Sequence, residues 1–583
     1  MPTLIFDIEA DGLLDTVSQI WEIVTMDVET KEVRSYHDGN THTHSEGDVA
    51  QGIEHLQSAD RLIAHNGIGY DLPVLRRLSN ASIDERNITD TLVLSRLGRP
   101  VRSGGHSLAA WGERLGYKKV EHEDWSQWSP EMEHRCKVDV EITYHLWKLL
   151  EPMYDIMPQA IETDHRVACL VADMVQQGFV LDLANARRVL DEKLTMREEM
   201  LTRFQDMFPP VLMPTQTVPK VYKSARNALS VDPGVPFTPL KVVEFSPTAR
   251  QQVARRLQQK YGWKPKVLTP TGVPKIDEDT LRELPWQEAH EFADFLVNDK
   301  LLSQLDGNNG WLKYVDDNNR VHASFNPTGA NTHRSSCSRP NLQQVAKAPE
   351  MRELWTTPEG MVLVGVDAAG LELRCLAHYL AAYDGGTYAD ILVNSDIHRH
   401  VQGLIGFSTL KKTKNAEYGW LYGAGNAKLG QIVRQDAQLG NVEIPKKTSN
   451  TKLGLALRRD MENGIDGLKA LTDAVAARAT SGKMRAIDNR PLWVRSEHSA
   501  LNLLLQSCGA VIIKTAWSLF NLPPHCHTVM QVHDEWQIEC PPERADEVGQ
   551  HVIDCIKLAG EMLDFRCPLN GKYLIGRSWN ETH

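Results

Sequence analysis

The chain has 583 residues, too many for one hydrophobic core, and a norm of about 100 to 200 residues per domain predicts three or four domains. Its nine cysteines are scattered without a CxxC pair, and no stretch approaches roughly 18 consecutive apolar residues, so a zinc module, a disulfide framework and a membrane span are not expected. The net charge of -12 argues mildly against a nucleic-acid partner, yet an acidic outer surface can coexist with a local basic groove. With no signal-peptide pattern at its start, we expect a cytosolic protein.

The first 150 residues alternate short apolar strands with helices, which predicts an α/β sheet domain. Strands are expected over residues 3–6, 20–26 and 61–64, and helices near residue 75 and over 90–97 and 139–150. Because side chains alternate along a strand, Asp7 and Glu9 point to the same face and together suit a cation. The alternative is a solvated edge strand. Asp71 and Asp139 are two further acidic residues at element ends.

The middle of the chain is expected to be mostly helical. Apolar residues recur at helical spacing over residues 184–208, with Asp182 as the cap and a Pro-Pro pair as the stop. Residues 209–243 are rich in proline and contain Lys220, Lys223, Arg226 and Lys241, which predicts a mostly irregular, mildly basic loop. Helices follow over about 246–305.

The last third has an α+β pattern with two acidic strand ends. An apolar strand over residues 361–366 leads into Asp367, and a hairpin over residues 528–540 carries Asp534. Two carboxylates on adjacent strands can hold two divalent ions roughly 3.5 to 4 Å apart, as phosphoryl-transfer enzymes do. Either strand end alone would more often be a solvated turn.

Two polar stripes lie on predicted helices between these strands. Lys411, Lys414 and Tyr418 fall at i, i+3 and i+7, a stripe that suits phosphates followed by a base, although a solvated helix end is the alternative for Lys411. His498, Asn502 and Gln506 step by four residues along an otherwise apolar helix. They suit the minor-groove acceptors that every base pair presents, and the alternative is an amphipathic helix facing water.

Longer motifs in the first domain resemble a known group of nucleases. The pattern DxE at residues 7–9, NxxxYD at 66–71 and a helical Asp139 resembles the proofreading 3'-5' exonucleases of the ribonuclease H-like DEDD group. Residues 90–97 and 106–112 are also similar to the sequence between these motifs in phage polymerases. The resemblance implies that two metal ions are bound by Asp7, Glu9, Asp71 and Asp139.

One position departs from that pattern. Polymerase-linked members of the group usually carry Tyr four residues before the last Asp, where this chain has Arg135. His134 lies five residues before Asp139, the spacing of the histidine branch of the group. Since an imidazole can accept a proton from an attacking water near neutral pH, we hypothesise that His134 is the general base. The alternative is an exposed histidine at the start of a helix.

Three motifs in the last third resemble, in order, motifs A, B and C of family A DNA polymerases: DAAGLELR at 367–374, KNAEYGWLYGAG at 414–425 and VHDE at 532–535. The polymerases of T-seven-like short-tailed phages are the most similar. The resemblance implies a multidomain α/β and α+β fold, with a ribonuclease H-like exonuclease domain over 1–155 and a right-hand polymerase domain over 156–583. Within the latter we expect the thumb at about 165–320, the palm at 321–395 and 485–583, and the fingers at 396–484.

The resemblance also implies roles for individual residues. Asp367 and Asp534 carry the metal ions, and Lys414, with His398, contacts the nucleotide phosphates. Glu372 and Tyr418 form a gate against a 2'-hydroxyl; a salt bridge from Glu372 to an arginine such as Arg374 is the alternative. Tyr418 in place of Phe implies tolerance of dideoxynucleotides. The family's Arg is Leu410 here, and we hypothesise that Lys411 replaces it. The duplex is contacted by Arg334, His498, Asn502, Gln506 and His533, although His333 stands where the family has Gly before Arg334.

The function implied is a primer- and template-dependent DNA polymerase with a proofreading exonuclease that replicates a phage genome in the cytoplasm of an infected bacterium. The cofactor is Mg²⁺, two ions per active site, with Mn²⁺ as a substitute. Substrates are primer-template DNA and deoxynucleoside triphosphates, and a phage helicase-primase and single-strand binding protein are candidate partners. Thioredoxin is not expected, because the loop at 209–243 is much shorter than the thioredoxin-binding insertion of the most similar family member. A gap-filling repair polymerase and a noncatalytic duplex-binding protein are the alternatives.

Overall fold

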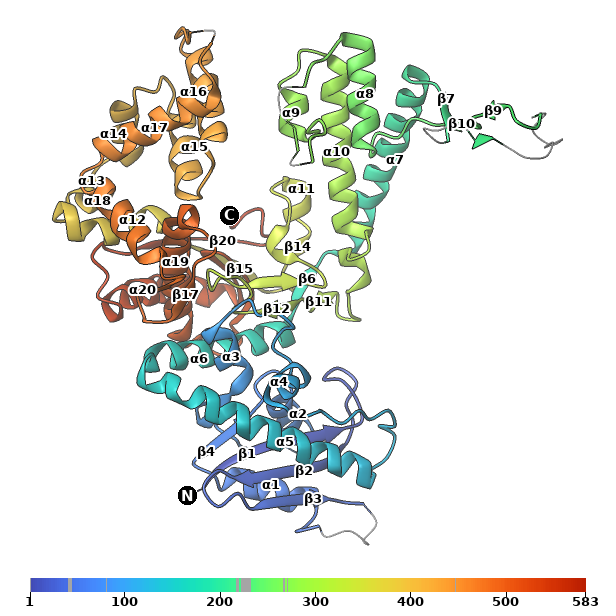
Figure 1. Cartoon of the computed structure of the whole chain (residues 1–583). Coiled ribbons are helices and arrows are strands. Elements are labelled where there is room, and N and C mark those ends of the chain that lie inside the picture. Colours follow the sequence, from blue (N-terminus) through green and yellow to red (C-terminus); the bar gives the residue numbers. More distant parts are fainter. Residues whose placement is uncertain are drawn as a thin grey trace. The chain divides into compact units, whose positions relative to one another are not determined.

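The computed structural model describes residues 2–39, 45–79, 81–215, 220–221, 232–265, 268–269, 271–445 and 447–583. The chain forms two compact units, coloured along the sequence in Figure 1. The first comprises Met1–Phe179, His322–Gln343 and Thr356–His583, and the second Val180–Val321 with Gln344–Trp355. The second unit overlaps most of the range predicted for the thumb, while the ranges predicted for the exonuclease, palm and fingers fall mainly in the first. The boundaries between those domains stay a prediction.

The first domain is built on a five-stranded sheet in the order β3-β2-β1-β4-β5. β1 pairs antiparallel with β2 and parallel with β4, the mixed arrangement of an α/β sheet. The three predicted strands are confirmed as β1 (Thr3–Ala10), β2 (Ile20–Asp27) and β4 (Arg61–Ala64), and the sheet also contains β3 (Val33–His37) and β5 (Ile88–Asp90), which were not predicted. Its helices are α1 (Val49–Gln57), α2 (Asp71–Ser79), α3 (Thr91–Gly98), α4 (Leu108–Leu115) and α5 (Pro130–Leu150).

The alternation along β1 decides what each face of the sheet buries. Leu4, Phe6 and Ile8 belong to one apolar cluster, together with residues of α1 and α2. Ile5, from the opposite face, packs with Val140 and other residues of α5, which runs along the sheet in Figure 1. Because Asp7 and Glu9 share the face of Ile5, their carboxylates are directed toward α5.

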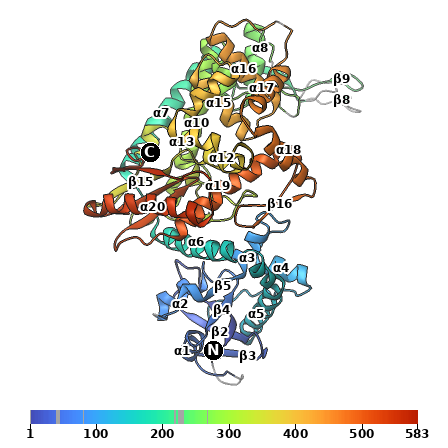
Figure 2. The ribbon, with the colours of Figure 1, turned by 90° about the vertical axis from the view of Figure 1, so that its left-hand side faces the viewer.

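Helix α6 (Pro158–Gln177) continues from the first domain into the polymerase region. It packs on α3 as well as on strand β18 and helix α19 of the predicted palm (Figure 2). Further short strands in this part of the chain are β6 (Phe179–Leu181), β11 (Arg320–Val321), β12 (Ser324–Asn326), β13 (Ser336–Ser338), β14 (Trp355–Thr356), β16 (Lys483–Arg485) and β17 (Pro491–Trp493).

The second unit is mainly helical, and its long first helix is confirmed as α7 (Leu183–Met207), where the Asp182 side chain accepts a hydrogen bond from the Asn185 N–H at 2.9 Å. An aromatic core joins α7 to its neighbours through Phe204, Phe208, Phe245, Phe292 and Phe295. The other helices are α8 (Arg250–Tyr261), α9 (Glu278–Arg282) and α10 (Gln287–Asp306).

The loop at 209–243 is more regular than the prediction of a mostly irregular segment. β7 (Val211–Pro214) pairs antiparallel with β10 (Leu240–Val243), and β8 (Lys220–Val221) pairs with β9 (Pro236–Phe237). Valine and leucine at these ends favour extended pairing, which the proline content of the segment obscured. Lys223 and Arg226 lie outside the described residues.

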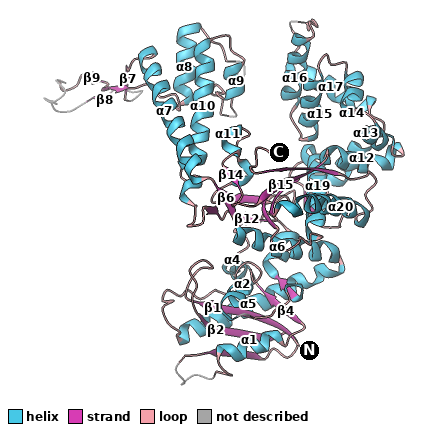
Figure 3. Cartoon of the chain, turned by 180° about the vertical axis from the view of Figure 1, so that it is seen from behind, coloured by secondary structure: helices cyan, strands magenta, loops and turns pink. Residues whose placement is uncertain are grey.

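The predicted palm is a four-stranded antiparallel sheet in the order β18-β19-β15-β20, drawn in magenta in Figure 3. Its strands are β15 (Val362–Ala368), β18 (His527–Val532), β19 (Glu535–Cys540) and β20 (Gly571–Gly576), and its helices α12 (Leu371–Asp384), α19 (Ala500–Ser518) and α20 (Ala545–Met562). Within the described residues one helix, Glu497–Ser518, is long and apolar enough to cross a membrane by length and composition, but 78% of its most apolar stretch is buried inside the protein. This burial identifies α19 as a core helix of a folded domain.

The predicted fingers are helical and share the palm's apolar core through residues such as Val401, Trp420 and Leu429. Their helices are α13 (Thr387–Asn394), α14 (Ile397–Ile405), α15 (Leu410–Leu421), α16 (Asn426–Leu439), α17 (Asn450–Gly464) and α18 (Leu468–Ala479). Lys411, Lys414 and Tyr418 therefore lie on one helix, α15.

Candidate active sites

The two predicted polymerase carboxylates come from neighbouring strands of the palm sheet. Asp367 is near the end of β15, opposite Glu535 of β19, and Asp534 lies in the turn between β18 and β19. The Ala368 N–H donates a 3.0 Å hydrogen bond to the Asp534 carbonyl oxygen, which fastens the turn to the end of β15. The sheet therefore brings Asp367 and Asp534 to one edge.

Their environment favours a cation. Burial, with the carboxylates of Glu372 and Asp367, raises the pKa of Asp534 to about 7. Burial also raises the pKa of Asp367; Lys572, 3.9 Å from its Oδ2, lowers it in part, and Glu535 raises it further. Carboxylates that repel one another this way are stabilised by a shared divalent ion. The residues thus fit the divalent metal ions that family A polymerases use.

Glu372 is paired with residues that differ from those suggested by the sequence. Its Oε1 accepts hydrogen bonds from the Tyr422 hydroxyl at 2.7 Å and from Arg334 Nη2 at 3.3 Å. The alternative pairing with Arg374 is not formed, since Arg374 Nε donates to the Ala369 carbonyl at 2.7 Å. The Tyr418 ring lies parallel to that of Tyr422, with centroids 6.3 Å apart. Sequence reasoning missed Tyr422, which follows Tyr418 by one helical turn.

The nucleotide-binding candidates gather around α15. Lys411 and Lys414 are exposed and Tyr418 is half-buried. His398, in the first turn of α14, hydrogen-bonds through Nδ1 to the buried carboxylate of Glu417, also on α15. This contact fixes the orientation of the His398 ring.

The duplex-binding candidates lie on different elements and differ in their exposure to solvent. Asn502 donates a 2.9 Å hydrogen bond to the Leu421 carbonyl, and Gln506 is half-buried on the same helix, α19. His498 is exposed on the short 3-10 turn Glu497–Ser499 that precedes α19, so the regular stripe predicted for one helix is interrupted. His533 is exposed at a φ of 54° in the turn that carries Asp534.

The turn before Arg334 keeps a glycine-like backbone although its residue is histidine. His333 has a φ of 61°, a left-handed conformation that disfavours a side chain. Its ring is completely buried and its Nε2 donates a 3.0 Å hydrogen bond to the Pro491 carbonyl. Burial lowers the pKa of His333 to about 3, so the ring is neutral. The packing of this ring holds the turn that presents Arg334 to Glu372.

Several supporting residues of the polymerase site were not predicted from the sequence. Glu535 is buried and accepts hydrogen bonds from Trp579 at 2.7 Å and Gln537 at 2.5 Å, and it pairs with His583 Nδ1 at 2.6 Å. Its carboxylate is thus occupied by side chains and braces the end of β19. Glu535 was visible in the VHDE motif, but two of its three partners, Trp579 and His583, lie 44 and 48 residues downstream.

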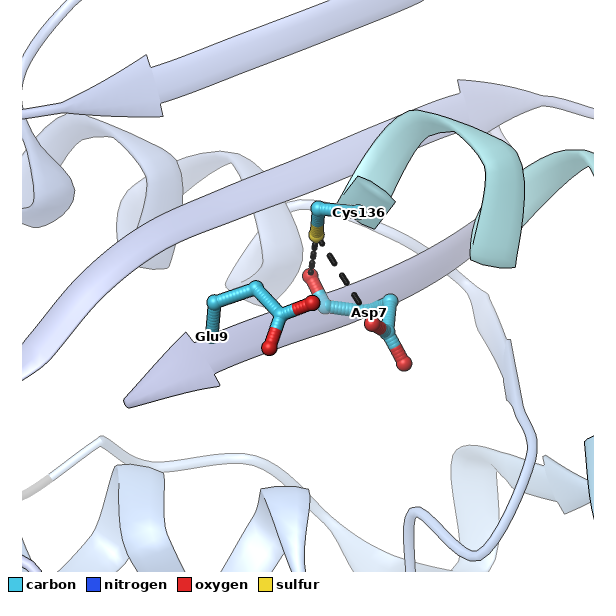
Figure 4. Close-up of side chains that lie close together, drawn as sticks. All are labelled: Asp7, Glu9 and Cys136. Carbon is cyan, nitrogen blue, oxygen red and sulfur yellow. Dashed lines mark hydrogen bonds between the residues drawn. The ribbon is translucent and has the colours of Figure 1, made fainter. Parts of the chain in front are cut away.

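The second carboxylate cluster lies in the first domain. Asp7 and Glu9 come from β1, Asp71 begins α2, and Asp139 lies on α5. The Ile8 N–H donates a 3.3 Å hydrogen bond to Asp71 Oδ1. Figure 4 shows Cys136 directed at Asp7, whose carbonyl oxygen is 3.5 Å and whose Oδ2 is 3.7 Å from the thiol sulfur. The structure therefore brings all the predicted exonuclease carboxylates together.

Burial dominates the electrostatics of this cluster. It raises the pKa of Glu9 and of Asp71 to about 7 and that of Asp139 above its ordinary value. For Asp7, burial together with Asp139, Asp71 and Glu9 holds the pKa well above the usual range. Asp139 Oδ1 is buried with no hydrogen-bond partner in the described structure. Repelling carboxylates and an unpartnered oxygen fit a divalent metal ion.

Arg135, rather than His134, lies at the carboxylates. Arg135 Nε donates a 2.9 Å hydrogen bond to Glu9 Oε1, and Lys119 Nζ forms an ion pair with Asp139 Oδ2. His134 is exposed, and within the described part of the chain no hydrogen bond or ion pair is found for it. Its role as a general base stays a prediction without a supporting contact.

Both regions of the chain match known protein families. The sequence model of DNA polymerase family A matches residues 238–581, and that of the RNase H superfamily matches residues 4–132. The chain is 28% identical to the DNA-directed DNA polymerases of Enterobacteria phage T3 and of Escherichia phage T7, in each case over 100% of both chains. The fold resembles the polymerase domain of Pol1 from M. smegmatis in complex with DNA primer-template and dNTP, with a TM-score of 0.75 and 18% identity over 99% of this chain and 96% of that one.

The family match covers more than half of the chain, and it spans the sheet edge that carries Asp367 and Asp534. The RNase H-like match covers the sheet that carries Asp7 and Glu9. This chain belongs to DNA polymerase family A and is a DNA-directed DNA polymerase with an RNase H-like exonuclease domain.

Proposed function

We propose that this polymerase copies a phage genome from a primed template and that its RNase H-like domain removes nucleotides from the primer 3' end. The observation that carries the proposal is the convergence of Asp367 and Asp534 at one edge of the palm sheet, with the pKa of Asp534 raised to about 7. The relatives in phages T3 and T7, which align over their full lengths, support a replicative role in a phage.

In the polymerase site, Asp367 and Asp534 would hold two Mg²⁺ ions, with Mn²⁺ as a substitute. When bound, such ions lower the pKa of the primer 3'-hydroxyl and neutralise charge on the triphosphate. Lys414, Lys411 and His398 would contact the nucleotide phosphates. The buried Glu417 carboxylate positions the His398 ring for that contact.

The sugar and the duplex are contacted by other groups. Glu372, held by Tyr422 and Arg334, would lie under the sugar and exclude a 2'-hydroxyl, with Tyr418 beside it. The duplex would be contacted in the minor groove by Arg334, His498, Asn502, Gln506 and His533. Such contacts test base-pair geometry without reading the sequence, because the minor-groove acceptors are shared by all pairs.

In the exonuclease site, Asp7, Glu9, Asp71 and Asp139 would hold two further divalent ions. Phage helicase-primase and single-strand binding protein are the partners proposed for replication, in the cytoplasm of the infected bacterium. No thioredoxin partner is proposed. This follows from the short segment at 209–243, whose two ends pair as β7 and β10.

A primer-extension gel, run with and without nucleotides, tests synthesis and degradation together. We expect Asp367→Asn and Asp534→Asn to lower synthesis on the order of 10³-fold, because the loss of a metal ligand removes several kcal/mol of transition-state stabilisation. Both variants should still degrade the primer when nucleotides are absent. Asp7→Ala should show the opposite pattern.

The matched control is Asp554→Asn, which alters an exposed aspartate of α20 that pairs with Lys557 at 3.1 Å and accepts a 2.9 Å hydrogen bond from Gln550 of the same helix. It should extend primers at the wild-type rate. Undiminished synthesis by Asp534→Asn would refute the proposed polymerase site.

A further inference from the structure

Two of the exonuclease carboxylates, those of Glu9 and Asp139, are paired with positive side chains. Arg135 Nε lies 2.9 Å from Glu9 Oε1 and 3.9 Å from Asp139 Oδ2. Lys119 Nζ forms its ion pair with the same Asp139 oxygen. Two side-chain cations therefore occupy carboxylate oxygens that the proposed function assigns to divalent ions.

The position of Arg135 is fixed by the surrounding structure. Arg135 and Asp139 are four residues apart on α5, so both face β1. The guanidinium lies over the Trp125 ring, 4.7 Å from its centroid, and the side chain is only 17% exposed. Trp125 is itself held by the Trp21 indole N–H, which donates a 2.9 Å hydrogen bond to its carbonyl. Arg135 is thus clamped between an aromatic ring and Glu9.

The chemistry of these groups limits what they can do. A guanidinium stays charged and has only donors, so Arg135 cannot take a proton from an attacking water. Its effect on the site is a fixed positive charge next to Glu9 and Asp139, which opposes the approach of a second cation. Lys119 has the same sign and lies at the same carboxylates.

We propose that Arg135 and Lys119 are built-in counter-ions of the exonuclease site, and that divalent ions must displace them from Glu9 and Asp139 to bind. This inference rests on the proposed exonuclease function. On this inference, Arg135 and Lys119 lower the affinity of the exonuclease site for divalent ions.

The test measures Mn²⁺ binding by titration calorimetry and electron paramagnetic resonance on the full chain carrying Asp367→Asn and Asp534→Asn, which removes the polymerase ligands. Arg135→Gln and Lys119→Met are introduced separately into this protein. Each should bind Mn²⁺ on the order of tenfold more tightly, because one opposing charge is gone.

The matched control is Lys137→Met, two residues from Arg135 on the same helix, whose ion pair is with Glu133 outside the cluster. It should leave Mn²⁺ affinity unchanged. A second readout is the melting temperature. Without metal, Arg135→Gln and Lys119→Met should melt below the parent protein, because carboxylates lose their counter-ion, and Mn²⁺ should raise their melting temperature by more than it raises that of the parent.

The outcomes separate the inference from the proposed function. Binding that is present in the parent protein but unchanged or weaker in both variants overturns the counter-ion role and leaves the exonuclease site intact. Binding that is absent from the parent, or that survives Asp7→Ala, overturns the site itself and the inference with it. If Arg135→Gln does not fold, Lys119→Met alone decides the question, since Lys119 is on the rim of the cluster and 25% exposed.

Discussion

The raised pKa of Asp534 makes the free energy of unfolding of this enzyme depend on pH. Its pKa of about 7 in the metal-free protein stands against an ordinary value of 3.8, so between about pH 4 and 7 the folded state holds this proton more tightly than the unfolded chain. The contribution of Asp534 to the free energy of unfolding is therefore largest below pH 4 and falls as the pH rises to 7.

We accordingly expect Asp534→Asn to stabilise the metal-free protein at pH 8 by about 1 to 2 kcal/mol, a figure reduced for the partial solvent exposure of the group, and to have little effect at pH 4.5. Urea unfolding in the presence of a chelator at the two pH values measures this difference. An equal gain at both pH values would contradict the assigned pKa.

Tyr418 allows a second prediction at this scale. The hydroxyl of Tyr418 is expected to stand in for the missing 3'-hydroxyl of a dideoxynucleotide, so Tyr418→Phe should lower the relative incorporation of dideoxynucleotides about 10- to 100-fold, the equivalent of one hydrogen bond to a charged group. Competition between dideoxy- and deoxynucleotides in a sequencing gel measures the ratio. Tyr383→Phe, at a tyrosine 45% exposed on α12, is the control. Equal ratios for Tyr418→Phe and the parent would count against the role of the hydroxyl.

Some site residues could be predicted from sequence and others could not. The common face of Asp7 and Glu9 follows from strand periodicity, and the pairing of Asp367 with the downstream hairpin follows from two acidic strand ends. The contacts of Arg135 with Glu9 and of Tyr422 with Glu372 join residues 126 and 50 positions apart. They depend on how helices pack on the sheets, which no local pattern encodes.

At the scale of elements, a buried group of charges joins α6 to α19. Asp164 of α6 accepts hydrogen bonds from Arg490 Nη2 and from Lys514 Nζ of α19, each at 3.0 Å. Burial opposes the charge of Asp164, but Arg490 and Lys514 hold its pKa well below the usual range. Burial lowers the pKa of Lys514 to about 8, although Asp164 acts in the opposite direction.

Removing one member of such a buried group should be costly. Asp164→Asn leaves the charges of Arg490 and Lys514 undercompensated, and we expect it to destabilise the protein by about 3 to 5 kcal/mol. The exposed Asp173 on the same helix provides the control, since Asp173→Asn should change stability by less than about 0.5 kcal/mol. Urea midpoints of the variants report the difference, and similar midpoints for the two would refute the importance of this group.

Elements with strong local signals were the predictable ones. Helix α7 lies within one residue of its predicted bounds, because a cap, an apolar period and a proline stop all agree. The strands β7 and β10 were missed, since their partners are separated by a proline-rich stretch and strand pairing is not local.

At the scale of the whole molecule, the order of the two catalytic domains follows from long motifs in fixed order, and the comparisons agree with that order. The net charge of -12 gave no such guidance, because a sum over the whole chain does not show where on the folded surface the charges lie. Where the basic surface for the duplex lies is a property of the folded chain and not of its composition.

The size of the loop at 209–243 gives a prediction for the whole enzyme. Because this segment spans only residues 209–243, we expect that thioredoxin does not lengthen the products of a single binding event. Primer extension with excess trap DNA, with and without thioredoxin, measures product length. A thioredoxin-dependent phage polymerase serves as positive control, and longer products with thioredoxin would show that the prediction is wrong.

The hydrogen bond from the Ala368 amide to the Asp534 carbonyl bears on which amino-acid substitutions this enzyme can accept during evolution. The positions of Asp367 and Asp534 relative to each other are fixed by main-chain atoms, which nearly every amino acid supplies equally. Side chains at exposed palm positions can therefore change while both strands persist. Divergence to the 28% identity found for the T3 and T7 polymerases is compatible with such a tolerant arrangement.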